Sequence, residues 1–389
     1  MFRITAKERP DWQAQAQAHG FEFHTMYGEK YWDESAYYQF SLKQIEQDLE
    51  APSEELHQML LHVVELVCND EALLQQFAIP QSQWELVTRS WRRRDLALYG
   101  RFDFSYDGKS PAKLLEANYD TPTSLFETGY WQWLWLQQQV DAGQLPRNAD
   151  QFNSLQEALI ERFYQLHKFH RGQPLHFACC KNSSEDLGTI QYMRSCAMAA
   201  GLKTREGFIE DIGLIEDQFV DLQSQPIHWM FKLYPWEFMF TDEYSHSLTA
   251  SNTQWLEPAW KAILSNKAIL PLLWQTFPNH PNLLPAYFEA DKSKLQHHPS
   301  GYVKKPLFSR EGANIDIYRH GQLLAQSSGD YGAEGYIYQA YHALPEFSDM
   351  RTLIGSWMVG DNAVGIGVRE DSSLITQDLS RFLPHIILG

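Results

Sequence analysis

The chain has 389 residues, of which 14% are aromatic, and a formal net charge of −17. This length can bury a large core, whereas the negative charge argues against a nucleic-acid partner, whose phosphates would require a basic face. The first residues, MFRITAKERPDW, contain no apolar signal region, no stretch is long enough for a membrane span, and the four cysteines show no CxxC spacing. We therefore expect a cytoplasmic protein without a membrane segment, a disulfide framework or a zinc site.

The first hundred residues favour helices. Apolar residues at helical spacing follow Ser53, which is predicted to begin the first long helix. A second helix is predicted over residues 82–92 and ends in Arg92-Arg93-Arg94. This basic run is typical of a helix C-terminus, where it complements the dipole, and phosphate binding is the alternative interpretation.

The sequence RFDFSYDGKSPAKLLEAN at residues 101–118 predicts a β-hairpin. Polar and aromatic residues alternate in its first half, which is the period of a half-buried strand. The DGKSP segment has the composition of a turn. A symmetric hairpin would place Asp103 opposite Glu116 and Arg101 opposite Asn118.

Two carboxylates at facing strand positions repel each other unless a cation lies between them. The oxygen ligands Asp103, Glu116 and Asn118 suit a hard ion, and Mg²⁺ that bridges phosphates is the common case. The alternative is a solvent-facing hairpin with a surface ion pair between Arg101 and one of the two carboxylates. Thr121-Pro122 is predicted to be the N-cap and first residue of the next helix, whose free amides could hold an anion.

A long apolar helix and then an amphipathic helix are expected after the hairpin. The first contains three tryptophans between residues 131 and 135, and the second covers residues 153–170. His167 and His170 at its end, together with His176, have no carboxylate at ligand spacing. Ordinary surface histidines are therefore the simpler interpretation.

A strand predicted over residues 175–180, followed by a helix and a new strand near Lys203, forms a βα unit of the kind that builds α/β sheets. Ser184 is predicted to cap the helix. Glu185 and Asp186 in the first turn are favoured by the helix dipole alone. They also follow the C-terminal end of a strand, where α/β proteins collect ligands, so both interpretations stay open.

The segment GYVKKPLFSREGANI at residues 301–315 predicts a strand, a glycine-containing turn and a second strand. A lysine that precedes Pro306 can place its ammonium on phosphate oxygens, and the backbone N–H groups of residues 308–314 can face the same anion. The loop lacks GxxxxGK[ST] and is not a Walker A loop. Further strands are predicted at 334–341, where the backbone could contact adenine, and around a Gly360-Asp361-Asn362 turn. A nucleotide-using enzyme needs a lysine, a glycine-containing loop, acidic ligands and arginines, and this chain has all of these groups.

Five motifs in this order resemble the glutathionylspermidine synthase-like proteins of the ATP-grasp superfamily, particularly their stand-alone synthetase members. They are RFDF…KLLEANYDTPTSL, SNKAILPLLW, VKKPLFSREGANI, YIYQAYHALP and GIGVREDSSLI. The resemblance spans residues 27–384 and implies an α/β ATP-grasp fold, with a nucleotide held between two sheet-bearing subdomains. Because no additional amidase domain is recognised, it implies ligase chemistry alone.

The resemblance also implies a role for individual residues. It implies magnesium ligation, as the hairpin pattern does, by Asp103, Glu116 and Asn118. It implies nucleotide binding by Arg101, Lys267, Lys305, Glu311, Gly312, Gln339, Ala340, Tyr341, His342 and Leu374. The two catalytic arginines would be Arg101, at the transferred phosphoryl and acyl groups, and Arg369. Substrate binding is implied for Thr121 and Asp186, where glutathione binds in the family, and for Glu185, where the polyamine binds.

One departure from the family pattern concerns the amine. Members that use spermidine carry a carboxylate near the C-terminus, at the position where this chain has Arg381. A cation there would repel an amine cation unless Asp378 compensates. The departure leaves the ligase reaction intact and puts spermidine in doubt as the amine.

We therefore expect one ATP-grasp ligase domain over residues 1–389. Its parts would be a mainly helical segment at 1–100, the metal hairpin and acceptor side at 101–260, and the nucleotide-binding part at 261–389. The predicted reaction uses ATP and Mg²⁺ to join a small-molecule or peptide carboxylate to an amine through an acyl phosphate. The alternatives are a nucleotide-binding regulatory protein without turnover and a small-molecule kinase.

Overall fold

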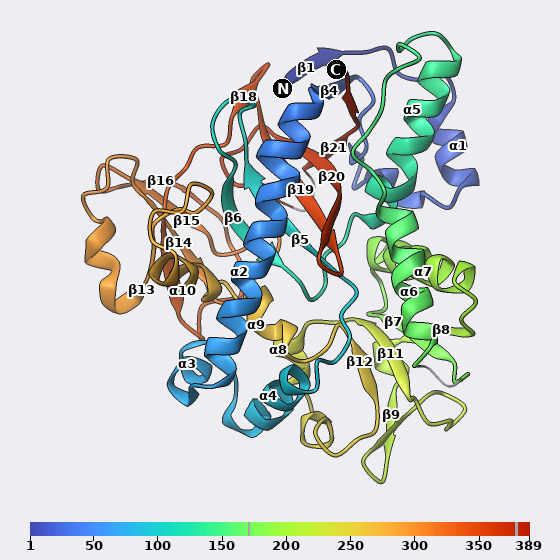
Figure 1. Ribbon diagram of the computed structural model, residues 1–389, viewed down its shortest axis with the longest axis vertical. Coiled ribbons are helices and arrows are strands. Elements are labelled where there is room, and N and C mark those ends of the chain that lie inside the picture. Colours follow the sequence, from blue (N-terminus) through green and yellow to red (C-terminus); the bar gives the residue numbers. More distant parts are fainter. Residues whose placement is uncertain (170–171, 378–379) are drawn as a thin grey trace.

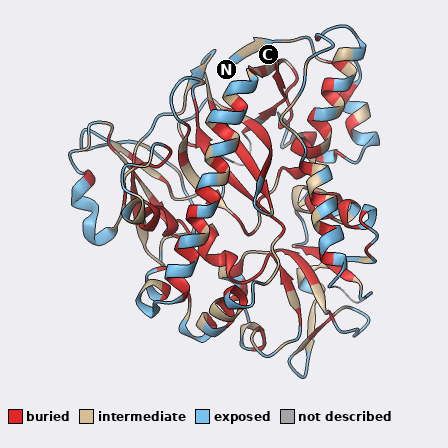
Figure 2. Cartoon of the chain, viewed as in Figure 1, coloured by how far each residue is buried: buried red, intermediate tan, exposed pale blue. Residues whose placement is uncertain are grey.

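The computed structural model describes residues 1–169, 172–377 and 380–389 of a mixed α/β protein (Figure 1). Two antiparallel sheets and one parallel sheet contain most of the strands. Helices cover these sheets, and the strands at the centre of the molecule are almost entirely buried (Figure 2). The α/β class predicted from the sequence is confirmed. None of the helices in the described ranges is both long and apolar enough to cross a lipid bilayer.

A six-stranded antiparallel sheet lies at the centre. Its strands, in spatial order, are β21 (Arg381–Leu383), β20 (Asn362–Asp371), β19 (Met350–Val359), β5 (Tyr99–Ser105) and β6 (Lys113–Asn118), with β18 (Glu346–Phe347) paired to β19. The long helix α2 (Ala51–Cys68) crosses one face of this sheet and contacts β19 and β20 (Figure 1). The Gly360-Asp361 turn joins β19 to β20, which confirms the predicted hairpin.

The β5–β6 hairpin has the predicted register. Asp103 pairs with Glu116, and Arg101 pairs with Asn118. Side chains alternate between the two faces of a strand. Phe102 and Phe104 therefore enter the apolar core, while the polar residues that alternate with them share the opposite face. The hairpin thus presents its charged residues together on one side of the central sheet.

A second antiparallel sheet contains the predicted 301–315 segment. Its five strands, in spatial order, are β13 (Ala286–Phe288), β17 (Tyr336–Ala340), β14 (Tyr302–Pro306), β15 (Asp316–Arg319) and β16 (Gln322–Gln326). A loop over residues 307–315 connects β14 to β15. The predicted order of strand, glycine-containing turn and strand is confirmed.

A four-stranded parallel sheet confirms the predicted βα unit. Its strands, in spatial order, are β12 (Gln254–Leu256), β11 (Trp229–Leu233), β7 (Leu175–Cys179) and β8 (Thr204–Phe208). All residues of β7 are buried, as is usual where helices cover a parallel sheet. Helix α7 (Ser184–Ala199) follows β7 and packs on α6 (Leu155–His167). The N-cap is Ser183 and not the predicted Ser184, because Ser183 Oγ accepts the N–H of Asp186 at 3.1 Å.

The remaining elements are short. The other helices are α1 (Trp12–Ala18), α3 (Glu71–Gln76), α4 (Trp84–Arg92), α5 (Gln132–Asp141), α8 (Trp236–Met239), α9 (Lys261–Ser265) and α10 (Ile269–Thr276). A small three-stranded sheet contains β1 (Phe2–Thr5), β4 (Ala36–Phe40) and β22 (His385–Ile387). Two strands pair in each of two further sheets: β2 (Thr25–Met26) with β3 (Glu29–Lys30), and β9 (Gly213–Ile215) with β10 (Gln218–Val220).

Two predicted helix starts are wrong. A π-helical segment over Gln44–Glu50 runs directly into α2, so Ser53 lies inside the helix and donates to the Leu49 carbonyl at 2.6 Å. Thr121-Pro122 does not begin a helix either. The chain remains irregular until Leu125, and a π-helical turn, η4 (Glu127–Trp131), then leads into α5.

Candidate active site

Two adjoining cavities lie where the three main sheets meet. The larger has a volume of about 310 Å³ and extends towards the start of α7, and the smaller, of about 120 Å³, lies against the five-stranded sheet. Both are lined by Asp103, Glu116, Lys267, Ser309, Gly312, Leu353 and Thr376. The shared wall therefore contains two carboxylates and a lysine.

Every residue to which the family resemblance assigns a magnesium, nucleotide, catalytic or substrate role lines at least one of the two cavities. The larger is lined by Arg101, Asp103, Glu116, Asn118, Thr121, Glu185, Asp186, Lys267, Glu311, Gly312 and Arg369. The smaller is lined by Asp103, Glu116, Lys267, Lys305, Gly312, Gln339, Ala340, Tyr341, His342 and Leu374. The fold thus brings the five sequence motifs together, while the role of each residue stays a prediction.

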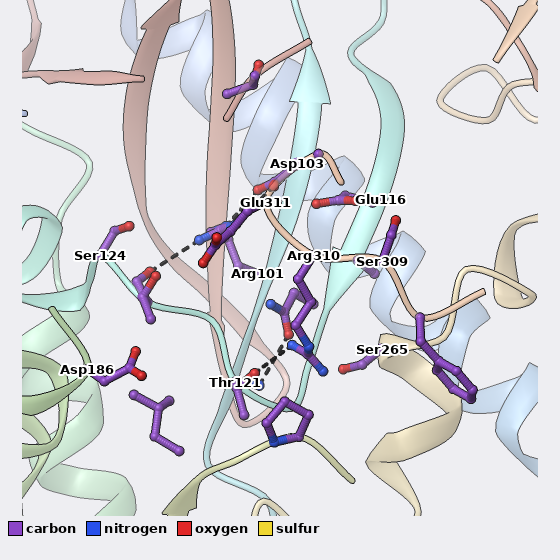
Figure 3. Close-up of a pocket in the computed structure, with 18 of the residues that line it drawn as sticks. Arg101, Asp103, Glu116, Thr121, Ser124, Asp186, Ser265, Ser309, Arg310 and Glu311 are labelled. Atoms are coloured by element: carbon purple, nitrogen blue, oxygen red, sulfur yellow. Dashed lines mark hydrogen bonds and ion pairs between the residues drawn. The ribbon is translucent and has the colours of Figure 1, made fainter. Parts of the chain in front are cut away.

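Arg101 and Asp103 form a bidentate ion pair on the floor of the larger cavity (Figure 3). Arg101 Nε lies 2.6 Å from Asp103 Oδ1, and Nη2 lies 2.9 Å from Oδ2. Both side chains are buried. The alternative interpretation of a solvent-facing hairpin is therefore wrong, although the pairing of these two residues is real.

Glu116 is surrounded by cations. Lys267 Nζ lies 3.2 Å from Glu116 Oε2. Burial on its own would raise the pKa of Glu116, but Lys267, Lys305 and Arg101 together lower it to about 2. Burial raises the pKa of Asp103 above its usual value, against the opposing effect of Arg101. This part of the site holds a dense set of opposite charges before any substrate binds.

Oxygen atoms of the kind that Mg²⁺ prefers lie in the shared wall and beside it in the larger cavity. Asp103 and Glu116 supply carboxylates, and Asn118 supplies an amide oxygen that accepts the N–H groups of Asp120 and Thr121 at 3.3 and 3.2 Å. In the described ranges no cluster of three or more His, Cys, Asp or Glu side chains has metal-binding geometry. Mg²⁺ does not require one, because it retains waters and is commonly bound by one or two carboxylates together with substrate phosphates.

Two consecutive lysines of β14 point to opposite faces, as strand alternation requires. Lys305 Nζ lies 2.9 Å from the Leu115 carbonyl and 2.7 Å from Gln339 Oε1, in the smaller cavity. Lys304 instead lies over the Tyr336 ring, 3.8 Å from its centroid, and 3.8 Å from Asp316. Burial, reinforced by Lys267, lowers the pKa of Lys305 to about 8.

The smaller cavity offers a flat apolar space next to this charge. Its apolar walls come from the three middle strands of the five-stranded sheet, from the segments that follow β14 and β17, and from the segment after β20. They are formed by Val303, Ile315, Ile317, Ala340, Tyr341, Leu344, Leu374 and Ile375. Gly312 packs closely on that last segment. A Cβ atom at Gly312 would lie 2.6 Å from the Thr376 carbonyl, and its φ of +70° favours glycine.

Arg310 was not predicted as a site residue, yet it connects the 307–315 loop to the opposite wall (Figure 3). Its Nη1 donates to Thr121 Oγ1 at 2.6 Å, and its Nε and Nη2 donate to Glu237 Oε1 at 2.9 and 2.8 Å. Thr121 therefore contributes a hydroxyl to this bridge and does not cap a helix. The SREG motif contained Arg310, but no sequence pattern indicates partners so far away in the chain.

Acidic residues dominate the far end of the larger cavity. Burial, reinforced by Glu185, raises the pKa of Asp186 to about 6. The Tyr31 hydroxyl donates to Glu185 Oε1 at 3.2 Å. Glu127 lies behind this pair and is also buried. Tyr31 and Glu127 were not predicted, because one lies in an N-terminal aromatic cluster and the other in an apolar helix.

Arg381 forms an ion pair that the sequence did not predict. Its Nη1 lies 3.2 Å from Asp33 Oδ2, its side chain is 44% exposed, and it is not among the residues that line the larger cavity. Asp33 therefore offsets its charge. The predicted compensation by Asp378, like the predicted position of His170, lies outside the described residues.

Comparisons with known proteins agree with these features. The family profile "Glutathionylspermidine synthase preATP-grasp" matches residues 3–388. The chain is 39% identical over 400 residues to the "Putative acid–amine ligase" of Haemophilus influenzae, with 99% of both chains covered. It is 29% identical over 371 residues to the bifunctional glutathionylspermidine synthetase/amidase of Escherichia coli, a match that covers 88% of this chain and 58% of that enzyme. The fold is similar to that of a glutathione synthetase-like effector from Globodera pallida, with a TM-score of 0.59, 12% identity and 98% of both chains covered.

Proposed function

Because the chain belongs to the glutathionylspermidine synthase preATP-grasp family and has an ATP-grasp fold, we propose that it is an ATP- and Mg²⁺-dependent ligase. It would join a carboxylic acid to an amine. The observation that carries the proposal is the wall shared by the two cavities, where Asp103 and Glu116 lie beside Lys267. A nucleotide at this wall would have its base on the apolar side and its phosphates beside the charged groups.

The residues divide between the nucleotide and the other two substrates. In this proposal the adenine lies in the smaller cavity along Gln339–His342, and Lys267 and Lys305 hold the phosphates. Mg²⁺, when bound by Asp103, Glu116 and Asn118, would offset phosphate charge. The larger cavity then receives the acid and the amine.

The chain's arginines would stabilise the charge that develops during transfer. A carboxylate oxygen of the acid attacks the γ-phosphorus, the bond to the ADP oxygen breaks, and an acyl phosphate forms. Arg101 and Arg369 would compensate the negative charge on the transferred group. The amine nitrogen then attacks the acyl carbon, the carbon–oxygen bond to phosphate breaks, and an amide results. Because acyl phosphates hydrolyse readily, we propose that the 307–315 loop excludes water by means of the Arg310 bridge.

The test is phosphate release from ATP with a panel of acids and amines. Relatives with glutathionylspermidine synthetase in their names suggest glutathione and dipeptides as the acids, and spermidine and amino acids as the amines. A ligase releases phosphate only when both substrates are present, and mass spectrometry then detects the amide. A regulatory protein would bind ATP without release, and a kinase would release ADP with the acid alone and leave a phosphorylated product.

A further inference from the structure

Glu127 is a buried carboxyl that the reaction described above does not use. It belongs to the π-helical turn η4, its side chain is 1% exposed, and its Oε1 has no hydrogen-bond partner among the described residues. Buried carboxyls are normally paired or hydrogen-bonded through both oxygens, because burying them otherwise costs free energy. Packing alone therefore does not explain why a carboxyl group lies at this place.

Tyr31 connects Glu127 to the larger cavity. The Tyr31 side chain is 2% exposed, and its hydroxyl lies 3.2 Å from Glu185 Oε1 while also interacting with the Glu127 carboxyl. Glu185 in turn lines the cavity. Three segments far apart in the chain thus place carboxyl, hydroxyl and carboxyl in a row that leads from the cavity into the interior.

The ligase reaction needs a route of this kind. Aliphatic amines are protonated at neutral pH, and an ammonium nitrogen has no lone pair with which to attack an acyl carbon. A proton must therefore leave the amine before the carbon–nitrogen bond forms. We propose that Glu127 is the acceptor of this proton, which reaches it through Glu185 and Tyr31; the proposal rests on the ligase function above.

The proton balance is simple. The ammonium gives one proton to the Glu185 carboxylate, the Tyr31 hydroxyl accepts that proton while giving its own to the Glu127 carboxylate, and the amine nitrogen regains its lone pair. After the amide forms, the nitrogen's second proton leaves with the phosphate. The route requires an ionised Glu127 at the start of each cycle and returns its proton to solvent afterwards.

The surroundings of Glu127 suit this task. Tyr31 and Glu185 face it from the N-terminal segment and from α7, and Arg369 acts on it from β20. Burial, reinforced by Glu185, raises the pKa of Glu127 to about 8. An acceptor whose pKa lies near the working pH transfers protons most effectively.

The experiment compares two kinds of amine in the same enzyme. Hydroxylamine is largely unprotonated at neutral pH and needs no proton acceptor, whereas glycine and spermidine arrive as ammonium ions. Glu127→Gln and Tyr31→Phe should lower kcat with glycine or spermidine by about 100-fold or more, and should leave hydroxamate formation with hydroxylamine within about threefold. The matched control is Tyr192→Phe. Tyr192 is also a buried tyrosine, but it lies on α7, and this change should alter neither reaction.

The pH profile and an infrared titration separate this role from a structural one. With glycine, kcat should rise with pH through about 8 in the wild type and lose this limb in Glu127→Gln. Infrared difference spectra of the intact protein should show a buried carboxylic acid C=O band that disappears over the same pH range and is absent in Glu127→Gln. A wild type without this band, or equal losses with hydroxylamine and with ammonium substrates, would overturn the proposal. A wild-type protein that forms neither hydroxamate nor amide would instead refute the ligase function itself.

Discussion

Asp103 and Glu116 occupy directly opposed positions of the β5–β6 ladder, and each carboxylate meets a different cation, Arg101 for one and Lys267 for the other. Arg101 opposes the effect of burial on the Asp103 carboxyl, and Lys267 holds the Glu116 carboxylate in its charged form. This arrangement also means that removing one of the carboxylates has two opposing effects on folding, because a repulsion and a favourable ion pair are lost together. The hairpin is therefore a place where activity and stability can be separated by mutation.

Asp103→Asn should weaken the apparent affinity for Mg²⁺ by about 10- to 100-fold. Changing a residue that only hydrogen-bonds to a metal ligand typically has an effect of this size. The free energy of unfolding should change much less, for the reason just given. Turnover measured against Mg²⁺ concentration and a denaturant titration check the two parts. Asp107→Asn, in the hairpin turn outside both cavities, is the control. Unchanged turnover of Asp103→Asn at limiting Mg²⁺ would remove the metal from this position.

Lys305→Ala should lose nucleotide affinity by about 10- to 100-fold, since a hydrogen bond to a charged group contributes roughly 1.5–3 kcal/mol. Lys304→Ala should bind nucleotide nearly as the wild type does, because Lys304 lies on the other face of β14 beside Asp316 and Tyr336. Calorimetric titration with ATP measures both. The reverse ranking would put the nucleotide on the opposite face of the five-stranded sheet.

The depressed pKa of Lys305 predicts opposite pH effects on binding and on stability. As pH rises through about 8 the ammonium loses its proton, so ATP affinity should fall. The unfolded chain has a lysine pKa near 10.5 and holds more protons than the folded chain between about 8 and 10.5, so the free energy of unfolding should rise over this range. Both trends should be weaker in Lys305→Met. An ATP affinity that is constant across pH 8 would contradict the assignment of this lysine to phosphate.

Arg310→Lys should uncouple ATP hydrolysis from ligation. Lysine keeps the positive charge but cannot donate to Thr121 and Glu237 from a planar fork, so the 307–315 loop should close less tightly and admit water to the acyl phosphate. The ratio of phosphate released to amide formed measures this effect and should rise above one. Arg351→Lys, whose partner Glu346 lies outside both cavities, is the matched control. A ratio that stays at one would show that the bridge does not exclude water.

Spermidine should be a poor acceptor, and an amine with its own carboxylate should be preferred. The sequence resemblance gave a reason for this expectation, a cation in place of a carboxylate at position 381, but the ion pair between Arg381 and Asp33 weakens it. We therefore expect Arg381→Asp to improve spermidine use only modestly. Initial-rate competition between spermidine and glycine, in the native protein and the variant, decides the matter. Efficient spermidine ligation by the native protein, unchanged in the variant, would contradict the prediction.

The residues that line the candidate site were easier to predict from the sequence than the contacts that hold those residues in place. Period-2 alternation on both sides of a turn predicted that Asp103 faces Glu116, and the two residues do pair, although a bulge between Asp103 and Phe104 shifts the register nearer the turn. Strand alternation likewise accounts for the opposite faces of Lys304 and Lys305. These inferences depend on neighbours in the chain, which is why pattern alone was sufficient.

Contacts between distant segments could not be inferred in this way. Thr121 looked like a helix cap, but its hydroxyl binds Arg310, which lies in a different sheet connection. The hydroxyl of Tyr31 reaches Glu185 from the N-terminal segment. No local periodicity records such pairings, since they arise only when the sheets pack together.

The strand order of the central sheet has a consequence for synthesis of the protein. The hairpin with Asp103 and Glu116 leaves the ribosome early, whereas β19, the strand that flanks β5 on its other side, is formed by Met350–Val359. Until that strand emerges, β5 has a free edge of backbone donors and acceptors that can pair with other chains. We therefore expect nascent chains arrested before residue 350 to aggregate or to remain bound to chaperones. The β5–β6 hairpin is made early in translation, but its sheet is completed late.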